Sequence, residues 1–455
     1  MMDLRGRSVA IVGLGQSGIA AATLCLRKGA RVTVCDEAAR ERLPPEALGL
    51  EAAGARLACG PLSADLLCAA ELVVVSPGVP AREAVAAAER AGREVVSELE
   101  LAARFLVAPI ALVGGTNGKS TVTALTHAML AAALPRVFVG GNFGTPLSAA
   151  VDQPFDALVV EISSFQAERV PTLHARAAAL LNVTEDHLDR YPSFQAYADA
   201  KGNPFVRQTP DDVAVIPEGD ALCAAQAARG RARVVRFGTE PGRGDVAPEG
   251  DAIVDRRDGA RYSLARFQLR GRHNLANAAA AVALSRGMGA PVEAVARGLE
   301  GFAGLAHRTV LVAEHDGVSY YDDSKGTNVG AAVAALSGLA EPRAVLIAGG
   351  RDKQGSYGPL VQALRDRGRA LVVVGEAAER IAAAAGDALP VVRAATLAEA
   401  VARAAELARP GDAVLLSPAC SSYDMFRDYK ERGEVFVAAV RALGAARGAR
   451  AGGPS

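Results

Sequence analysis

Lys119 and Ser120 are the residues whose types and spacing point most directly to chemistry. They follow a glycine-rich stretch, 114–118, that comes after an apolar run and before a helix-forming run from Val122 to Ala133. Such a loop turns several backbone N–H groups inward, and the following helix adds the positive end of its dipole. The lysine adds a full charge and the serine hydroxyl can ligate Mg²⁺, so the pattern predicts a site for ATP or a similar nucleotide.

The spacing of this loop differs from that of a standard P-loop. The standard pattern has four residues between its first glycine and the Gly-Lys pair, which places that glycine at position 113, where this chain has Val113. Here only three residues separate Gly114 from Gly118. The alternative is an ordinary glycine turn. A Gly-Lys-Ser sequence that opens a helix directly after a strand favours the phosphate loop.

Acidic residues follow two later apolar runs. Glu161 ends the first, and it is either a solvated strand end or a ligand that holds Mg²⁺ opposite the loop. After the second run, acids surround a histidine, which is typical of a hard-cation site; these residues are Glu185, Asp186, His187 and Asp189. Lys201, taken alone, is equally well a solvated lysine on a helix.

A second candidate phosphate loop lies near the start of the chain. Gly13-Leu-Gly-Gln-Ser-Gly18 follows the apolar run 8–12 and precedes a helix, with Asp36 after the next run. This pattern predicts a dinucleotide site or, equally, a site for another diphosphate, because it requires only a helix N-terminus and a close backbone. Two phosphate loops in one chain suggest one for ATP and one for a substrate with its own diphosphate. Ser76-Pro77-Gly78 is a ligand-binding turn or only a turn.

Composition narrows the class of protein. The chain has 455 residues, and Lys plus Arg equal Asp plus Glu at 50 each. A net charge of zero disfavours nucleic acid and anionic membranes as partners, and no apolar run is long enough to span a bilayer. The six cysteines are scattered without a Cys-x-x-Cys pair, which suggests a reducing cytoplasm.

Short apolar runs alternate with helical stretches, which predicts α/β domains with mostly parallel sheets. The length suggests three domains, at 1–98, 99–304 and 305–455: a Rossmann-like domain, a central P-loop ATPase-type domain and a second Rossmann-like domain. The segment 228–262 reads as loops or a small excursion. Strands are expected at 8–12, 31–35, 72–75, 94–97, 110–113, 136–139, 157–162, 178–182, 213–216, 319–322, 344–348, 370–374, 391–394 and 413–416.

Several separated motifs carry a family resemblance. The sequences Gly-Thr-Asn-Gly-Lys-Ser-Thr (115–121), Glu-x-Ser-Ser-Phe-Gln (161–166), Asn-Val-Thr-Glu-Asp-His-Leu-Asp-Arg (182–190) and Ala-Lys (200–201) resemble the ATPase domain of the Mur ligase family. The stretch 417–426, Ser-Pro-Ala-Cys-Ser-Ser-Tyr-Asp-Met-Phe, resembles the members that add D-glutamate. The Asp-Asn-Pro-Arg motif of diaminopimelate- and lysine-adding members is absent.

The resemblance implies an ATP-dependent ligase that adds D-glutamate to UDP-N-acetylmuramoyl-L-alanine through an acyl phosphate, in peptidoglycan precursor synthesis. It also implies a cytoplasmic monomer that uses ATP with Mg²⁺, two ions in the usual case, and Mn²⁺ as a substitute. A sister ligase adding another amino acid is the nearest alternative. A folylpolyglutamate synthase, an NAD-dependent dehydrogenase and a non-catalytic nucleotide sensor are further alternatives.

The resemblance also implies roles for single residues. Glu161, His187 and Ser120 would hold magnesium, and Lys201 would be carbamylated and ligate a second ion. One departure concerns Lys201: the family typically has an Arg two residues later on a continuing helix, whereas here Asn203 and Pro204 follow, and proline should end or kink the helix. The residues implied for ATP are Gly115, Thr116, Asn117, Gly118, Lys119, Ser120, Thr121, Asn274, Asn277, Arg308, Asp323 and Lys325.

The remaining implied residues contact the two other substrates. Without the resemblance, Asn274 would be a helix cap and Arg308 a surface charge. Cys420 is expected to be a packing residue rather than a nucleophile, because no histidine lies near it in the sequence. For the UDP-substrate the residues are Gly15, Gln16, Ser17, Asp36, Ser76, Pro77, Gly78, Asn142 and Ser163; for the amino acid they are Thr327, Lys353, Ser422, Tyr423 and Tyr429.

Overall fold

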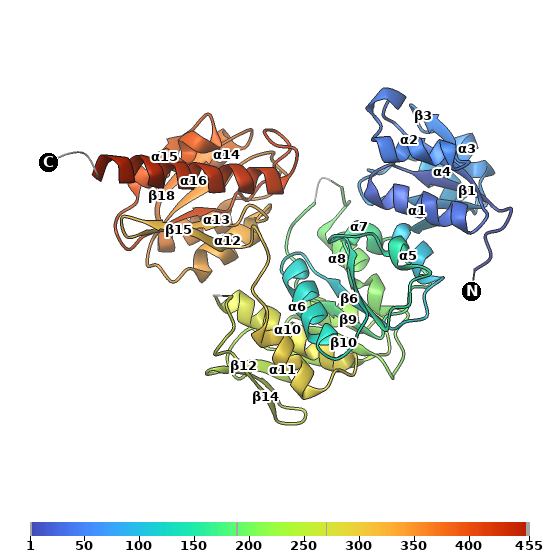
Figure 1. Cartoon of the computed structure of the whole chain (residues 1–455), viewed down its shortest axis with the longest axis horizontal. Helices are drawn as coiled ribbons and strands as arrows, with labels where there is room; N and C mark the ends of the chain where they lie inside the picture. Colours follow the sequence, from blue (N-terminus) through green and yellow to red (C-terminus); the bar gives the residue numbers. More distant parts are fainter. Residues whose placement is uncertain (1, 188–189, 270, 452–455) are drawn as a thin grey trace. The chain divides into compact units, whose positions relative to one another are not determined.

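The computed structural model describes residues 2–187, 190–269 and 271–451. The chain divides into two compact units: Met1–Val183 with Arg190–Phe267 and Ala276–Phe302, and Thr184–Asp189 with Gln268–Leu275 and Ala303–Ser455. The first unit holds two sheets and the second holds one (Figure 1). In the described part of the chain, no helix is both long and apolar enough to cross a membrane.

The first sheet is entirely parallel, in the order β3-β2-β1-β4-β5. Alternate residues of β1 face opposite layers: Val9 and Ile11 pack with α1, whereas Ala10 and Val12 pack with α3 and α4. The strands are β1 (Ser8–Val12), β2 (Arg31–Asp36), β3 (Arg56–Cys59), β4 (Leu72–Val75) and β5 (Glu94–Ser97). The helices are α1 (Gln16–Arg27), η1 (Arg40–Arg42), α2 (Pro45–Ala52), α3 (Ala64–Ala69), α4 (Glu83–Arg90) and α5 (Glu98–Ala103).

The second sheet has the order β14-β13-β12-β11-β10-β9-β6-β8-β7. Its strands are β6 (Ile110–Gly114), β7 (Val137–Gly141), β8 (Ala157–Glu161), β9 (Ala177–Leu180), β10 (Val213–Pro217), β11 (Arg233–Phe237), β12 (Val246–Glu249), β13 (Ala252–Asp255) and β14 (Ala260–Ser263). Its helices are α6 (Lys119–Ala131), η2 (Leu147–Ala150), α7 (Ser164–Ala167), α8 (Phe194–Gly202), η3 (Asn203–Phe205), α9 (Ala221–Ala227), α10 (Arg272–Gly287) and α11 (Val292–Glu300).

The segment 228–262 extends this second sheet, so its interpretation as loops is wrong. β11 adds a parallel strand beside β10, and β12, β13 and β14 continue it as an antiparallel meander. These strands have only four or five residues each, and turns of glycine and charged residues separate them, which obscures them in the sequence. The buried Asp255 that ends β13 pairs with Arg257 in the following turn.

The third sheet has the order β15-β16-β20-β17-β18-β19, with β15 antiparallel to β16 and the other pairs parallel. β15 (Val310–His315) was not expected, because it is a partly exposed edge strand that ends in Glu314 and His315. The other strands are β16 (Val318–Asp322), β17 (Ala344–Gly349), β18 (Gly368–Val374), β19 (Val391–Arg393) and β20 (Ala413–Leu416). The helices are α12 (Val329–Gly338), α13 (Gly358–Arg367), α14 (Ala378–Ala385), α15 (Leu397–Leu407) and α16 (Tyr429–Ala451).

Helices cover both faces of the third sheet. Leu346 and Ala348 of β17 pack with α12, α13 and α14, whereas Val345 and Ile347 pack with α15 and α16. Such double coverage explains the near-continuous apolar strands of the sequence. The parallel α/β architecture with three sheets confirms the expected fold class.

Candidate active site

The glycine-rich loop after β6 has the geometry of a phosphate cradle. Gly115 and Gly118 have φ angles of +140° and +85°, which only glycine adopts easily. Gly118 is the N-cap of α6, and the helix begins at Lys119, three residues before the start expected at Val122. The helix N-terminus therefore opens directly onto the loop, where its dipole favours an anion.

Asn277 lies against this loop. A Cβ atom placed on Gly118 would lie 2.5 Å from Asn277 Oδ1, so the close approach also requires glycine. The sequence alone offered no reason for Asn277. Asn274 is two residues inside α10, which begins at Arg272, so its interpretation as a helix cap is wrong.

Two lysines converge on one carbonyl oxygen of the loop. Lys119 Nζ donates to Gly115 O at 3.0 Å and to Thr116 O at 2.8 Å, and Lys201 Nζ donates to Gly115 O at 2.7 Å. Lys201 is 5% exposed, and its ammonium lies 4.6 Å from the centre of the Tyr197 ring. The structure thus brings Lys201 to the phosphate loop, a placement that the sequence alone could not give.

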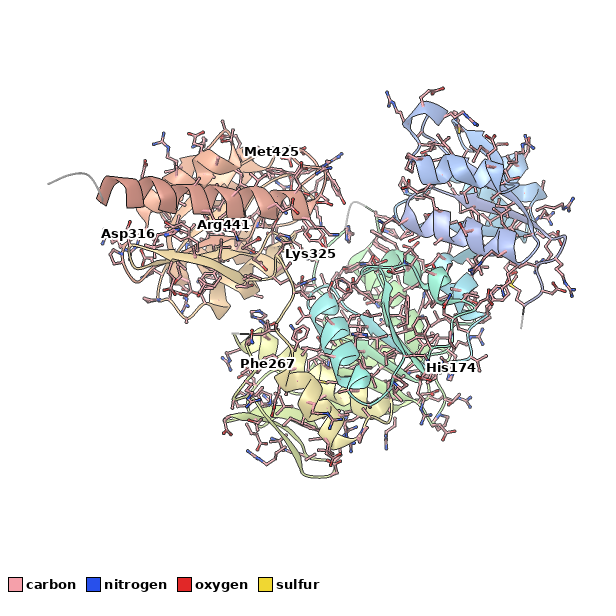
Figure 2. The ribbon with its side chains drawn as sticks, in the orientation of Figure 1. His174, Phe267, Asp316, Lys325, Met425 and Arg441 are labelled. Atoms are coloured by element: carbon pink, nitrogen blue, oxygen red, sulfur yellow. The ribbon has the colours of Figure 1, made fainter. Side chains whose placement is uncertain are left out.

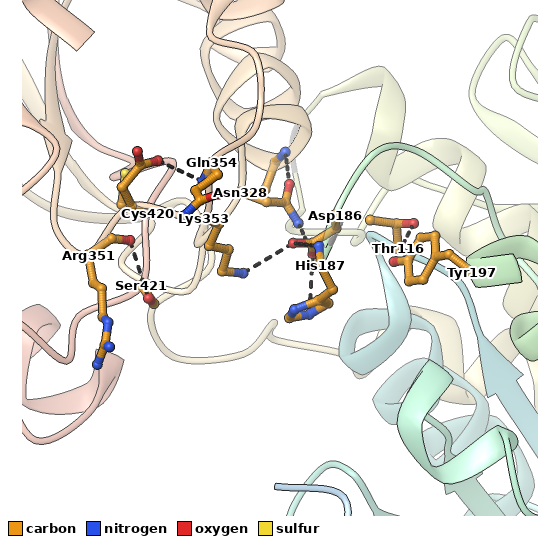
Figure 3. Close-up of polar contacts among 12 residues, drawn as sticks. Thr116, Asp186, His187, Tyr197, Asn328, Arg351, Lys353, Gln354, Cys420 and Ser421 are labelled. Atoms are coloured by element: carbon orange, nitrogen blue, oxygen red, sulfur yellow. Dashed lines mark hydrogen bonds and ion pairs between the residues drawn. The ribbon is translucent and has the colours of Figure 1, made fainter. Parts of the chain in front are cut away.

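Asn182 and Tyr197 brace the same loop and were not identified as site residues. Asn182 Oδ1 accepts a hydrogen bond from the Asn117 N–H at 2.9 Å, and Asn182 Nδ2 donates to Asn117 O at 3.1 Å. The hydroxyls of Tyr197 and Thr116 lie 3.2 Å apart (Figure 3). Asn182 could have been found in the sequence, because it follows an apolar strand at the edge where the loop lies.

Glu161 ends β8, which pairs with β6 so that Glu161 lies opposite Val113, beside the start of the loop. The side chain is 2% exposed, and its Oε1 accepts a hydrogen bond from Asn142 Nδ2 at 2.6 Å. Within the described chain Oε2 has no hydrogen-bond partner. A buried carboxylate with one oxygen unsatisfied fits a cation ligand, since burying an unpaired anion is otherwise costly.

Ser163 follows two residues after Glu161 and caps α7. Its hydroxyl donates to Gln166 Oε1 at 3.0 Å and accepts from the Gln166 N–H at 3.2 Å, which forms a capping box. The structure therefore gives Ser163 a structural partner and leaves its expected substrate contact a prediction.

Ser120 and Thr121 lie in the first turn of α6 and are buried, with 3% and 5% of their surface exposed.

The first loop, Gly13–Gly18, is tightly packed. A Cβ atom on Gly18 would lie 1.8 Å from Gly13 O, and the Ser76 hydroxyl donates to the same oxygen at 2.8 Å. Asp36 Oδ2 accepts a hydrogen bond from the Leu14 N–H at 2.7 Å. The Leu14 amide is therefore engaged within the loop, and the first turn of α1, where Gln16 and Ser17 follow the N-cap Gly15, is the part of the loop that suits an anion.

Arg190 links the turn at 76–78 to α7, the short helix that follows Glu161. Arg190 donates to Pro77 O at 3.1 Å, and its guanidinium stacks on the Phe165 ring at 3.8 Å. Gly78 has open space around its Cα, with nothing within 4 Å of an added Cβ. Arg190 is thus a further residue that joins the expected substrate turn to α7.

In the second unit, Asp186 is the centre of a polar cluster. Lys353 Nζ lies 3.3 Å from Asp186 Oδ1, and Asn328 Nδ2 donates to Asp186 Oδ2 at 3.2 Å (Figure 3). His187, with a φ of +53°, donates its backbone N–H to the same carboxylate at 3.0 Å. Lys353, expected to bind the carboxylate of an amino acid, therefore pairs with a carboxylate of the chain itself.

The expected cation site of Glu185, Asp186, His187 and Asp189 stays a prediction. Among the described residues, no group of three or more His, Cys, Asp or Glu could hold a metal, so Glu185, Asp186 and His187 do not form such a group by themselves. Asp189 lies outside the described residues. Asp186, the acid next to His187, pairs with Lys353 and accepts a hydrogen bond from Asn328.

Asp323 lies in the loop after β16. Burial raises its pKa to about 7, although hydrogen bonds from Ser417 and Thr309 and the charge of Arg308 oppose the shift. The Ser417 hydroxyl lies 2.6 Å from Asp323 Oδ2. Lys325, two residues later, places its ammonium 3.7 Å from the centre of the Tyr429 ring (Figure 2 shows Lys325).

Arg432 connects this loop to the segment 417–426 and was not identified from the sequence. It is 3% exposed, donates through Nε and Nη2 to Ser324 at 3.0 and 2.8 Å, and donates through Nη1 to Cys420 O at 3.1 Å. Burial lowers its pKa to about 10. Cys420 is buried, and burial raises its pKa to about 11, so its expected role in packing is consistent with a protonated thiol.

The residues expected around the amino acid differ in exposure. Ser422 is 3% exposed, and its carbonyl accepts the Phe426 N–H at 2.9 Å. Tyr423 is 66% exposed. Tyr429 opens α16, and the Thr327 N–H donates to Lys325 O at 2.8 Å. The structure therefore gathers Thr327, Lys325 and Tyr429 and directs Tyr423 to solvent.

Three family models match the chain. The model described as "Mur ligase MurD-like, N-terminal domain" matches residues 7–97, "Mur ligase middle domain" matches 113–285, and "Mur ligase, glutamate ligase domain" matches 307–420. Each match covers one of the three sheets.

Similar proteins cover nearly the whole chain. A protein of Anaeromyxobacter dehalogenans named UDP-N-acetylmuramoylalanine--D-glutamate ligase is 49% identical over 95% of this chain and 97% of its own length. A protein of the same name from Geotalea daltonii is 45% identical over 97% and 99%.

Solved structures share the fold at low identity. The UDP-N-acetylmuramate-alanine ligase of Thermotoga maritima has a TM-score of 0.60 at 20% identity, covering 96% of this chain and all of its own. The MurF ligase of Thermotoga maritima in complex with ADP has a TM-score of 0.59 at 17% identity, covering 97% and 96%.

Proposed function

Since this chain belongs to the Mur ligase family, we propose that it is the ATP-dependent ligase that adds D-glutamate to UDP-N-acetylmuramoyl-L-alanine in peptidoglycan precursor synthesis. The observation that carries this proposal is the convergence of Lys119 and Lys201 on Gly115 O, with Glu161 at the end of the adjacent strand. The Lys119 ammonium and the N-terminus of α6 at one loop suit a triphosphate, and Lys201 and Glu161 lie beside them. D-glutamate follows from the names of the relatives.

The reaction has two steps. A carboxylate oxygen of the L-alanyl group attacks the γ-phosphorus of ATP, the bond to ADP breaks, and an acyl phosphate forms. The amine of D-glutamate then attacks the acyl carbon, phosphate leaves, and the nitrogen loses a proton to give the amide. Lys119 and the N-terminal dipole of α6 stabilise the charge on the transferring group, which is the main way to catalyse phosphoryl transfer.

Glu161, Ser120 and His187 are the proposed ligands of Mg²⁺, with Mn²⁺ as a substitute, and a carbamylated Lys201 is the proposed ligand of a second ion. The unpartnered Oε2 of Glu161 supports the first assignment. When bound, the ions neutralise negative charge on the phosphates.

Carbamylation requires a neutral amine at Lys201. The Nζ lone pair attacks the carbon of CO₂, a C–N bond forms as one C=O π bond opens onto oxygen, and the nitrogen releases a proton. Burial disfavours the charged amine, and a second cation on the same carbonyl oxygen does so as well. The position of Lys201 beside Lys119 therefore supports the modification.

The remaining assignments are proposals of the same kind. Domain boundaries near 98 and 304, a monomeric state and a cytoplasmic location complete the proposal. The ATP residues are the loop 115–121 with Asn274, Asn277, Arg308, Asp323 and Lys325; the UDP-substrate residues are Gly15, Gln16, Ser17, Asp36, Ser76, Pro77, Gly78, Asn142 and Ser163; the amino-acid residues are Thr327, Lys353, Ser422, Tyr423 and Tyr429.

Phosphate release from ATP tests the function. The purified chain is assayed with UDP-N-acetylmuramate, its L-alanine form and its longer peptide forms, each with D-glutamate, L-glutamate, L-alanine, L-lysine or diaminopimelate. Turnover that requires both the L-alanine form and D-glutamate supports the proposal. Turnover with another pair, or oxidation of NAD(P)H, would replace it by a sister ligase or a dehydrogenase.

A further inference from the structure

The α-helix that carries Lys201 passes directly into the 3₁₀ helix η3, so its last turn lacks one α-helical backbone hydrogen bond. α8 stops at Gly202, and Pro204 supplies no N–H. The Asn203 N–H donates to Ala200 O instead of Asp199 O, which it would reach in a continuing α-helix. The Asp199 carbonyl, two residues before Lys201, must therefore find a donor elsewhere.

A side chain that follows α9 supplies that donor. Arg229 Nη1 donates to Asp199 O at 2.6 Å, and Arg229 Nη2 donates to Asn203 Oδ1 at 2.7 Å. The guanidinium thus bridges the residues on either side of Lys201, and a cation at a helix C-terminus is favourable. Gln226, which is 2% exposed, reinforces the bridge by donating to Asp199 Oδ1 at 2.8 Å and accepting from Arg229 Nη1 at 2.7 Å.

The backbone has a glycine on each side of the contact between the end of α8 and the segment that follows α9. A Cβ atom on Gly202 would lie 2.0 Å from Gln226 Oε1 and 2.7 Å from Arg229 Nη1. A Cβ atom on Gly230 would lie 2.1 Å from Phe205 O in η3. Glycines on both sides therefore allow the end of α8 and the end of α9 to meet face to face.

Asn203 extends the contact toward the strand that ends in Glu161. Its Nδ2 donates to Ala167 O at 2.8 Å, at the end of α7, which begins three residues after Glu161. The side chain of Asn203 therefore holds Arg229 with its oxygen and α7 with its nitrogen. One amide fixes the end of the lysine-bearing helix relative to the segment that follows Glu161.

We propose that Arg229, Gln226 and Asn203 form a clamp that positions Lys201 at the phosphate loop, with Arg229 as its principal positioning residue. The clamp replaces the stability that a continuing helix would give, and so reconciles Gly202-Asn203-Pro204 with a lysine held at Gly115. The inference rests on the proposed function in its claim that Lys201 takes part in the ligase reaction. The placement of Lys201 itself is independent of that claim.

Chemical labelling of Lys201 in the full-length protein tests the clamp directly. The wild type, Arg229→Met, Arg229→Lys and a control, Arg261→Met, are pulsed with acetic anhydride, and the acetylation rate of Lys201 is read by peptide mass spectrometry. Arg261 is an exposed arginine on β14 whose acidic neighbour, Glu249, lies 4.0 Å away. Thermal unfolding is measured on every variant, because only variants that stay folded report on local position.

Arg229→Met is expected to raise the acetylation rate of Lys201 about tenfold or more, since it removes all three hydrogen bonds of the guanidinium and so makes local opening of the end of α8 more frequent. It is also expected to lower kcat while leaving the KM for D-glutamate unchanged. The acetylation rate of Lys201 in Arg229→Lys should lie between those of the wild type and Arg229→Met. A single ammonium cannot reach both acceptors as the two ends of a guanidinium do. Arg261→Met should match the wild type.

An unchanged labelling rate in folded Arg229→Met, or an equal increase in Arg261→Met, would overturn the clamp. If Arg229→Met does not fold, Gly202→Ala takes its place, because the added Cβ displaces Gln226 and Arg229. If the wild type has no ligase activity, the proposed function fails, and the labelling rates still decide whether Arg229 positions Lys201.

Discussion

Glu98 is a fully buried carboxylate in α5 that is only half satisfied. Its Oε1 accepts the Ser148 N–H at 2.5 Å, whereas neither Glu98 Oε2 nor Ser148 Oγ has a hydrogen-bond partner among the described residues. Burial raises the pKa of Glu98 to about 7, against the hydrogen bond from Ser148, which favours the ionised form. We predict that Glu98→Gln stabilises the protein at alkaline pH.

The magnitude follows from the pKa. One pKa unit corresponds to about 1.4 kcal/mol, so a rise from 4.5 to about 7 makes ionised Glu98 about 3 kcal/mol less stable in the folded protein, as an upper limit. Between these two values the folded state holds more protons than the unfolded state, so the wild type loses stability as pH rises, down to a plateau above pH 7. Glutamine does not titrate and keeps an acceptor for the Ser148 N–H.

Glu100 in the same helix is a matched control. It is equally buried, but its carboxylate accepts the Leu173 N–H at 2.9 Å and pairs with Arg104 at 2.8 Å. Urea unfolding at about pH 5 and pH 8 should show Glu98→Gln near the wild type at the lower pH and up to about 3 kcal/mol more stable at the higher. Glu100→Gln should be destabilised at both, by about 1.5–3 kcal/mol. A Glu98→Gln protein less stable than the wild type at pH 8 would refute the reasoning.

Four further predictions concern the proposed reaction. Lys119→Met should lower kcat by about a thousandfold or more, with Tm unchanged, because it removes charge stabilisation of the transferring group; steady-state kinetics and calorimetry check this. Lys353→Met should raise the KM for D-glutamate about tenfold or more and leave the KM for ATP unchanged, since the ammonium is expected to hold a carboxylate; a rise in the KM for ATP alone would contradict it. Burial raises the pKa of Asp323 to about 7, so its carboxylate becomes charged, next to Arg308, as pH rises through neutrality. kcat/KM for ATP should therefore increase over this pH range, and a pH profile of Asp323→Asn should lack the increase. EDTA should abolish activity reversibly while leaving the thermal unfolding curve within a few degrees of the untreated protein, and irreversible loss would argue against exchangeable metal.

The fold was largely predictable because its strands are buried on both faces. Strands such as β6 and β17 read as unbroken apolar runs bounded by glycine, a pattern with few alternatives. The sequence failed where strands lie at an edge or are short: β15 lies at a sheet edge, and β12 to β14 are four-residue strands separated by turns of glycine and charged residues. In those segments, pairing with a neighbouring strand decides the structure, and pairing is not a local property.

The phosphate loop was predictable from local chemistry, whereas its supports were not. Lys119 follows from the spacing of glycines, and Glu161 from its place at a strand end. Asn182 and Tyr197 contact the loop from segments distant in sequence. In the second unit, Arg432 likewise contacts Ser324 from a distant segment. The use of Asp186 by Lys353 is likewise invisible in a sequence, because 167 residues separate the two.

The hydrogen bond from the Leu14 N–H to Asp36 has a consequence for how such sequences are sorted. In a nicotinamide enzyme the acid at this position binds the ribose hydroxyl of the cofactor. Here Asp36 Oδ2 accepts the Leu14 N–H and Oδ1 accepts the Ala38 N–H, so both oxygens are engaged by backbone amides. The glycine pattern alone therefore does not say which ligand the acid serves. Asp36→Ala would release the Leu14 amide toward solvent and should leave the loop freer to accept an unrelated anion, at the expense of its fixed shape.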